Sequence, residues 1–515
     1  MKPTEGRKRV LIEAVQPLVD CGRYPVRRFL GDQVTITAAV FGDGHDHVAG
    51  QLLYRHESET PWRSVALTPL GNDLWTASFV VDKLGGWSYS VQAWVDHIGT
   101  WCADLTKRLA AQPEPSPDPT EGHEQPEGIG ADPVVSNPDI PLALRTGAAL
   151  LADTAERAKA AKSKDALSIQ EVALALSWLA DQNAAHYEQP VTPEICELAN
   201  RFPKFELATR TKDFNLWENL HEVFAYWIRQ GVKIFRVDNP HTKALPFWEW
   251  CIAEVHASDP DVIFLAEAFT RPHVMYALAK SGFSQSYTYF TWRTEKAEIE
   301  QYFEEITKPP VSDFFTPNLW PNTPDILHAS LQTGGRPAFM QRLILAATLG
   351  ASYGIYGPAY ELCENLPVKP NSEEYLNSEK YEIRQWDLAA SHSIAPLITR
   401  VNQIRRENIA LQSDLSLHFH PVDNPQVICY SKNAGDNIIL VALNLDPHNE
   451  QAGWIDLDLK ILGMEHDETF DVEDLLTGTH YAWHDRSNFV ALRPDVMPAH
   501  NFRVTHNPIK TASAS

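Results

Sequence analysis

The chain has 515 residues, of which 44% are hydrophobic and 22% charged, and its formal net charge at pH 7 is -23. This composition is typical of a folded globular protein, and the length exceeds that of one typical domain. The negative charge disfavours nucleic acid and anionic membranes as partners, because both are polyanions, whereas it excludes nothing about neutral sugars.

The N-terminal segment carries strand patterns. β-branched and aromatic residues alternate with polar ones in 34–40, 74–81 and 87–94, with turn residues between them. Short strands with this spacing predict an N-terminal β-sandwich over residues 1–104. A scaffold or dimerisation module is favoured over a glucan-binding module, because a sandwich fold alone implies no function.

A proline-rich segment and then helical patterns follow. Seven prolines with many Glu, Asp, Gly and Ser residues lie between Gln112 and Pro138, which is typical of a solvated linker, placed here at 105–138. Ala-rich patterns with leucines on one face predict helices over 142–162 and 167–187. A Thr cap before Pro193 marks a further helix start. Residues 139–213 are therefore expected to form a helical insert.

From residue 214 the pattern alternates between helix and short apolar strand. Strands are expected at 232–237, 262–266, 286–290, 314–320 and 352–356. Helices are expected at 214–230, 247–257, 272–281, 293–306, 336–349 and 389–408. This alternation predicts a parallel sheet with crossover helices.

The predicted fold is α/β plus all-β. Residues 214–410 are expected to form a partial (β/α)8 (TIM-type) barrel, since five strands are counted where a closed barrel has eight. Alternating strands after Leu411 predict a C-terminal β-sandwich over 411–508. The first barrel strand counted, at 232–237, is expected to expose an unpaired apolar edge.

Cysteines and the N-terminus point to a cytoplasmic protein. The six cysteines include no CxxC pair, and we expect reduced structural thiols. The segment Met1–Arg7 has no apolar core of a signal peptide, and no run of about 18 apolar residues indicates a membrane span. No metal-ligand spacing and no Gly-rich phosphate loop are found, so neither a metal nor an organic cofactor is expected.

Two of the predicted strands end on a carboxylate, at Asp238 in Phe-Arg-Val-Asp-Asn and at Glu267 in Phe-Leu-Ala-Glu-Ala. The carboxyl end of a parallel barrel strand is where catalytic groups lie. Two such carboxylates suit the nucleophile and the general acid of a retaining glycosidase-type enzyme. Arg236 lies on the same side of its strand as Asp238 and would keep that carboxylate ionised. The apolar surroundings of Glu267 would raise its pKa.

Each carboxylate also has a structural interpretation. Asp238 alone is compatible with a turn residue, and Glu267 with a buried group satisfied by a backbone amide. Asp325, in Asn-Thr-Pro-Asp, is compatible with a helix cap. The ordered trio is more specific than any one of its members.

The order Arg-x-Asp, Glu, Asp is similar to the α-amylase superfamily. Phe-Arg-Val-Asp-Asn-Pro-His-Thr and Ala-Glu-Ala-Phe-Thr-Arg-Pro resemble its maltose-1-phosphate-dependent α-1,4-glucan maltosyltransferases. The resemblance implies Asp238 as nucleophile, Glu267 as general acid/base and Asp325 as transition-state stabiliser. It also implies that Arg236 supports the nucleophile. The remaining implied residues are Asn239, which would line the sugar site, and Lys380 and Tyr381, which would hold the donor phosphate.

The resemblance implies transfer of maltosyl from α-maltose 1-phosphate to the non-reducing end of an α-1,4-glucan, with retention, by a homodimer. The chain departs from the family between Ala208–Arg210 and Phe214–Trp217, where barrel strands one to three have no counterpart. Two alternatives therefore stay open. One is a catalytically inactive glucan- or partner-binding homologue, and the other is an α-amylase-type hydrolase or branching enzyme. Lys380 and Tyr381 favour the transferase, since a hydrolase has no use for a phosphate site.

Overall fold

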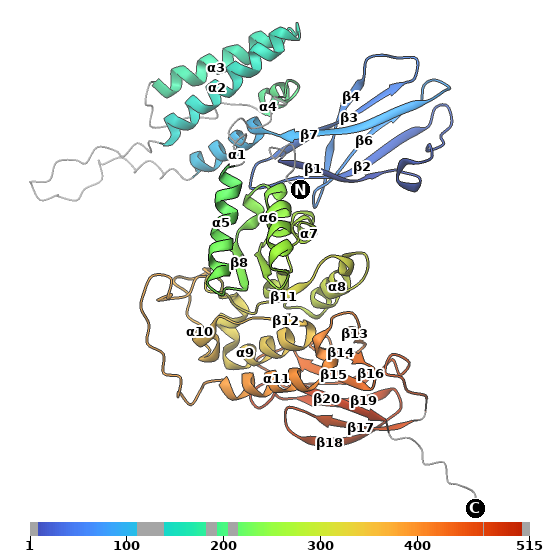
Figure 1. Cartoon of the computed structure of the whole chain (residues 1–515), viewed down its shortest axis with the longest axis vertical. Helices are drawn as coiled ribbons and strands as arrows, with labels where there is room; N and C mark the ends of the chain where they lie inside the picture. The colour runs from blue at the N-terminus through green and yellow to red at the C-terminus, as the bar shows by residue number, and fades with distance from the viewer. Residues whose placement is uncertain (1–8, 111–138, 182–192, 204–214, 467, 507–515) are drawn as a thin grey trace, which may run out of the picture. The chain divides into compact units, whose positions relative to one another are not determined.

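The computed structural model describes residues 9–110, 139–181, 193–203, 215–466 and 468–506 (Figure 1). The chain forms two units. The first comprises Met1–Phe224, His241–Cys251 and Arg271–Val274, and the second comprises Ala225–Pro240, Ile252–Thr270 and Met275–Ser515. Residues 111–138 of the linker expected at 105–138, and the end of the helix expected at 167–187, lie outside the described residues, whereas residues 105–110 are helical and not linker.

The N-terminal part of the first unit consists of two antiparallel sheets, as expected. The strands are β1 (Val10–Gln16), β2 (Gln33–Gly42), β3 (Val48–His56), β4 (Arg63–Ala66), β5 (Thr68–Gly71), β6 (Leu74–Val80) and β7 (Trp87–Val95). Their orders are β1-β2-β6-β5 and β4-β3-β7. Alternate residues of β2, among them Val34, Ile36 and Ala38, are buried in the core of this unit, which explains the period of two in the sequence.

Four helices follow in the same unit. They are α1 (His97–Ala110), α2 (Asp139–Ala160), α3 (Ala166–Asp181) and α4 (Pro193–Asn200). Figure 1 shows α2 and α3 side by side. The prediction of β-structure up to residue 104 is wrong from His97 onward, because Asp96 caps α1. Its Oδ1 accepts a hydrogen bond from the Gly99 amide at 2.7 Å.

The prediction that all cysteines are reduced is also wrong. Cys102 of α1 and Cys196 of α4 form a disulfide. They are 94 residues apart in sequence, and the packing of the helices brings them together, so spacing alone did not reveal the pair. Cys21, Cys251, Cys363 and Cys429 are free.

The central part is a five-stranded parallel sheet with crossover helices, which confirms the partial-barrel prediction. The strands are β8 (Ile234–Asp238), β9 (Ile263–Glu267), β10 (Gln285–Tyr287), β11 (Pro317–Leu319) and β12 (Ser352–Tyr353). The helices are α5 (Asn215–Arg229), α6 (Leu245–Ser258), α7 (Pro272–Lys280), α8 (Lys296–Ile306), α9 (Ala329–Leu349), α10 (Gly357–Glu361) and α11 (Ala395–Glu407). The strand order is β12-β11-β10-β9-β8.

Two of the expected elements differ in extent. The strand expected at 286–290 ends at Tyr287, and a 3-10 helix follows at Tyr289–Trp292, capped by the Thr288 side chain. Helix α9 begins seven residues before the expected Arg336, because a kink at Gly335 (φ +57°) lets the helix continue through a segment that contains Pro337. In the sequence, Gly335 and Pro337 have the pattern of a helix boundary, and the earlier part of the helix was therefore not predicted.

Strand β8 lies at one end of the sheet and pairs only with β9 among the described residues. Ile234 at its start is 58% exposed, as expected for an unpaired apolar edge. On the preceding helix α5, Leu220, Val223 and Trp227 are exposed as well. Apolar residues exposed at helical spacing form a surface that water solvates poorly.

The C-terminal part is antiparallel, as predicted. Its strands are β13 (His418–His420), β14 (Val427–Ala434), β15 (Asn437–Asn444), β16 (Gln451–Asp456), β17 (Thr469–Asp474), β18 (Thr479–His484), β19 (Ser487–Leu492) and β20 (Ala499–His506). They form a six-stranded sheet and a separate β16-β19 pair. Ile428 and Val441 of the larger sheet share one core with α9 and α11. The described helices include none with the length and apolar character of a membrane span.

Candidate functional site

Parallel pairing places Asp238 and Glu267 opposite each other. Strands β8 and β9 pair in register from Ile234 with Ile263 to Asp238 with Glu267. Both side chains therefore start from the carboxyl edge of the sheet, where α/β proteins bind ligands. The chain turns immediately afterwards at Asn239, whose φ of +44° is one that Asn tolerates better than most residues.

Arg236 bridges the two carboxylates. Its guanidinium lies 2.9 Å from Glu267 and 3.4 Å from Asp238. Asn239 also contacts both, since its amide N–H donates to Glu267 at 3.5 Å and its side-chain Nδ2 to Asp238 Oδ1 at 3.4 Å. Four of the expected site residues thus form one hydrogen-bonded group.

Burial separates the two carboxyl groups chemically. The side chain of Asp238 is 71% exposed, whereas that of Glu267 is 8% exposed. The pKa of Glu267 is raised to about 7, chiefly by burial and in part by a hydrogen bond with Asp238, while the charge of Arg236 opposes the rise. At neutral pH Glu267 therefore retains a proton in a substantial fraction of molecules, whereas Asp238 is accessible to a ligand. This asymmetry suits an acid and a nucleophile. The structural alternative for Glu267 is also partly met, since a backbone amide does contact it.

An aromatic wall next to Arg236 was missed by the sequence analysis. The Arg236 guanidinium lies 5.9 Å from the ring centre of Tyr287, at the end of β10. Tyr287 stacks on Trp320 with 4.8 Å between ring centres and meets Phe269 edge to face. Burial raises the pKa of Tyr287. No sequence signal pointed to Tyr287 as a strand end, because that strand was expected to continue to residue 290.

Asp325, Lys380 and Tyr381 form a second group. Lys380 Nζ lies 2.6 Å from Asp325 Oδ1 and 5.6 Å from the ring centre of Tyr381. The hydrogen bond that Lys380 donates to Asp325 raises the pKa of Lys380. The helix-cap interpretation of Asp325 is wrong, because the N-cap of α9 is His328. Among the described residues no hydrogen bond or ion pair links this group to the first one.

The described residues contain no cluster of three or more His, Cys, Asp or Glu side chains arranged to hold a metal ion. The first group itself offers the chemistry of paired carboxyl groups. One is exposed and paired with a guanidinium, and the other is buried and readily protonated. An exposed carboxylate and a protonatable carboxyl are the two kinds of group used in attack on an anomeric carbon with protonation of the leaving oxygen.

Comparison with known proteins gives two family matches. Residues 8–219 match the domain N/S model of "Alpha-1,4-glucan:maltose-1-phosphate maltosyltransferase", and residues 419–504 match the model described as "GLGE, C-terminal". The maltosyltransferase of that name from Chlorobaculum tepidum is 35% identical, over 98% of this chain and 97% of that protein. Maltosyltransferase 1 of Streptomyces coelicolor is 54% identical over 282 residues, 54% of this chain and 41% of that protein.

A solved structure is also similar. An α-amylase from Geobacillus thermoleovorans in complex with acarbose is 14% identical, with a TM-score of 0.46 over 58% of this chain and 66% of that chain.

The parallel sheet and its Arg-x-Asp and Glu strand ends, together with relatives along the whole chain, define a protein of the α-amylase superfamily. Within that superfamily the chain belongs to the α-1,4-glucan:maltose-1-phosphate maltosyltransferase family. The alignment with the Chlorobaculum tepidum protein spans 653 positions, while this chain has 515 residues. At least 138 aligned positions, the difference between the two numbers, therefore have no counterpart here.

Proposed function

We propose that the chain transfers maltosyl units from α-maltose 1-phosphate to the non-reducing end of an α-1,4-glucan, with retention of configuration and release of phosphate. The observation that carries this proposal is the pair of opposed carboxyl groups, Asp238 and Glu267, bridged by Arg236. Family membership along nearly the whole chain supports the choice of donor and acceptor.

In this proposal Asp238 is the nucleophile. Its carboxylate attacks the anomeric carbon of the donor, the bond to the phosphate oxygen breaks, and a maltosyl ester forms on Asp238 with phosphate leaving. Glu267 donates a proton to the leaving phosphate oxygen. It then takes the proton of the acceptor hydroxyl, which attacks the anomeric carbon from the face that the phosphate has left and so displaces Asp238 with retention of configuration. A pKa of about 7 allows Glu267 to serve in both directions at neutral pH.

The neighbouring residues assist these steps. Arg236 orients Asp238 by charge pairing at 3.4 Å. Asn239 lines the sugar site, and its contacts to both carboxyl groups support that placement. Asp325 stabilises the positive charge that develops on the sugar ring.

Lys380 and Tyr381 are proposed to hold the donor phosphate. Lys supplies a positive charge and Tyr a hydroxyl, and both suit a phosphate monoester. The ion pair between Lys380 and Asp325 implies that the bound phosphate competes with Asp325 for the ammonium group. Donor binding would then free Asp325 to face the sugar, which links donor binding to assembly of the site. No cofactor is required, and a homodimer is the proposed assembly.

The experiment is release of phosphate from α-maltose 1-phosphate with maltohexaose as acceptor. Release by the intact chain and its loss in Asp238→Ala are expected, together with lengthening of the maltohexaose. Starch alone is expected to yield no reducing sugar, and its hydrolysis would instead indicate an α-amylase-type hydrolase. A folded chain that neither releases phosphate nor extends the acceptor would refute the transferase.

A second candidate, a catalytically inactive glucan- or partner-binding homologue, rests on the open edge of the sheet. β8 has a neighbour on one side only among the described residues, and at least 138 aligned positions of the relative, 653 less 515, are unmatched. We infer that barrel strands one to three are among these positions, with one wall of the sugar pocket. Binding of maltohexaose that is unchanged in Asp238→Ala, without phosphate release from the donor, would favour this candidate.

A further inference from the structure

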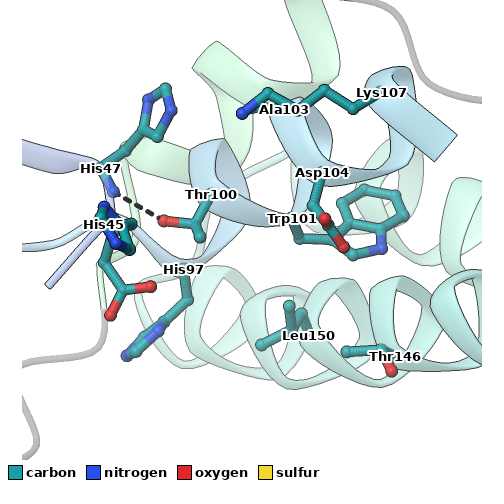
Figure 2. Close-up of a pocket in the computed structure, with 11 residues that line it drawn as sticks. His45, His47, His97, Thr100, Trp101, Ala103, Asp104, Lys107, Thr146 and Leu150 are labelled. Atoms are coloured by element: carbon teal, nitrogen blue, oxygen red, sulfur yellow. Dashed lines mark hydrogen bonds between the residues drawn. The ribbon is translucent and has the colours of Figure 1, made fainter. Parts of the chain in front are cut away.

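The first unit contains a cavity of about 460 Å³ that is formed without any residue of strands β8 to β12. Its walls come from the segment after β2, from α1 and from α2 (Figure 2). Figure 2 shows His45, His47 and His97 at one end and Trp101 and Leu150 toward the other. The cavity thus has an imidazole-rich end and an apolar end.

Each carboxylate of this cavity is paired with an arginine. Asp46 forms an ion pair of 2.8 Å with Arg9, and Asp104 forms one of 2.7 Å with Arg108. An arginine that engages a carboxylate cancels most of its field at short range. Arg9 also pairs with Asp43 at 2.7 Å, so its charge is shared between Asp43 and Asp46 and offsets only part of the charge of Asp46.

Other polar groups of the lining are also engaged. The Thr100 hydroxyl accepts a hydrogen bond from the His47 backbone N–H and donates one to Asp96, both at 2.8 Å. The Trp101 indole N–H donates to the Ala143 carbonyl at 2.7 Å. A ligand in the cavity would consequently find few hydroxyl or indole donors left.

The basic side chains of the lining are the polar groups that a ligand could still contact. Within the described part of the chain, the side chains of His47, His97 and Lys107 make no hydrogen bond or ion pair, and His45 has a ring contact with His241 at 6.0 Å. Figure 2 shows the Lys107 side chain running along α1 toward its N-terminal end, the end that carries the histidines. Each neutral imidazole offers one N–H donor, and the ammonium group offers three.

We propose that this cavity binds a phosphate group, either free or carried by a small sugar. A phosphate presents several charged acceptor oxygens and needs donors from several directions, which the histidines and Lys107 provide. A sugar attached to the phosphate would lie on the apolar side of the lining near Leu150, since Trp101 is 5% exposed and packed in the helical core. The site uses none of the residues assigned to the transferase reaction, so it stands apart from the proposed function.

The test is isothermal titration of the full chain with inorganic phosphate, with α-glucose 1-phosphate and with glucose. Either phosphate compound is expected to bind, and glucose is not. His47→Gln and Lys107→Gln should each weaken phosphate binding about tenfold, the usual effect of losing a hydrogen bond to a charged group. Lys380→Gln is the matched control, since it removes a lysine from the proposed donor site and leaves this cavity intact.

Phosphate affinity that falls in His47→Gln and Lys107→Gln, with unchanged thermal unfolding, and survives in Lys380→Gln would support the proposal. If a cavity variant fails to fold, His97→Gln provides the same comparison. The proposal is overturned if neither phosphate compound binds, if glucose binds as tightly as glucose 1-phosphate, or if only Lys380→Gln abolishes binding. Phosphate binding here with no transferase activity would leave this site standing and refute only the proposed function.

Discussion

Replacing Glu267 by Gln should stabilise the protein at alkaline pH. The pKa of this buried carboxyl is raised from 4.5 to about 7. At about 1.4 kcal/mol for each tenfold change in acidity, holding the ionised form in the folded site costs about 3 kcal/mol relative to the unfolded chain. The neutral amide of Gln avoids this cost and can still accept the hydrogen bond from the Asn239 amide.

The pH range of the effect follows from the direction of the pKa change. A carboxyl whose folded pKa lies above its unfolded value stabilises the fold fully below the unfolded pKa, and this contribution is lost as pH rises through the folded pKa. Native Glu267 and the glutamine variant should therefore unfold alike below about pH 4.5, diverge as the pH rises from 4.5 to about 7, and differ by a constant amount above that. At pH 8 the variant should be more stable by about 3 kcal/mol, or about 6 °C in unfolding temperature for a unit of this size.

Calorimetry of the intact chain and of Glu267→Gln at pH 5 and pH 8 checks this prediction. Asp238→Asn is the matched control, because its side chain is 71% exposed and neutralising an exposed carboxylate changes stability by less than about 1 kcal/mol. A glutamine variant that is destabilised at pH 8, or stabilised equally at both pH values, would refute the reasoning.

Three further predictions follow from single contacts. Arg236→Met should move the alkaline limb of kcat/KM for maltosyl transfer to higher pH, because the charge of Arg236 lowers the pKa of Glu267; an unmoved limb would contradict this. Trp227→Glu should reduce self-association in light scattering, because this indole belongs to the exposed apolar residues of α5 and is 49% exposed. Unchanged self-association would show that these residues of α5 take no part in it. Asp414→Ala should cost about 3–5 kcal/mol in denaturant unfolding, because it leaves Lys432, 1% exposed and 3.1 Å from Asp414, unpaired. Lys432→Met should cost less, and the reverse order would refute the argument.

Local patterns explain which parts of the fold the sequence could predict. The apolar runs before Asp238 and Glu267 mark parallel strands, of which β9 is largely buried whereas β8 is the exposed edge of the sheet. The apolar residues at helical spacing in α5 indicate a helix, and Gly231, with φ of +97°, marks its end. Each of these features is contained in a few consecutive residues, so they were visible without any tertiary information.

Features that depend on distant residues were not accessible in the same way. The bond between Lys380 and Asp325 joins residues 55 positions apart. The aromatic wall at Tyr287 requires the order of strands, and the Cys102–Cys196 disulfide requires the packing of helices. The helix after Asp96 is a different case, because its cap is local and a strand pattern just before it led to the wrong assignment.

The most direct test of the central claim is incubation of the intact chain with α-maltose 1-phosphate in the absence of acceptor. The account predicts one equivalent of phosphate released per chain, with a mass increase of one maltosyl unit on the peptide that contains Asp238, and neither in Asp238→Asn. A folded chain that binds the donor but releases no phosphate and carries no adduct would contradict the account. It would show that five strands do not suffice to build this catalytic site.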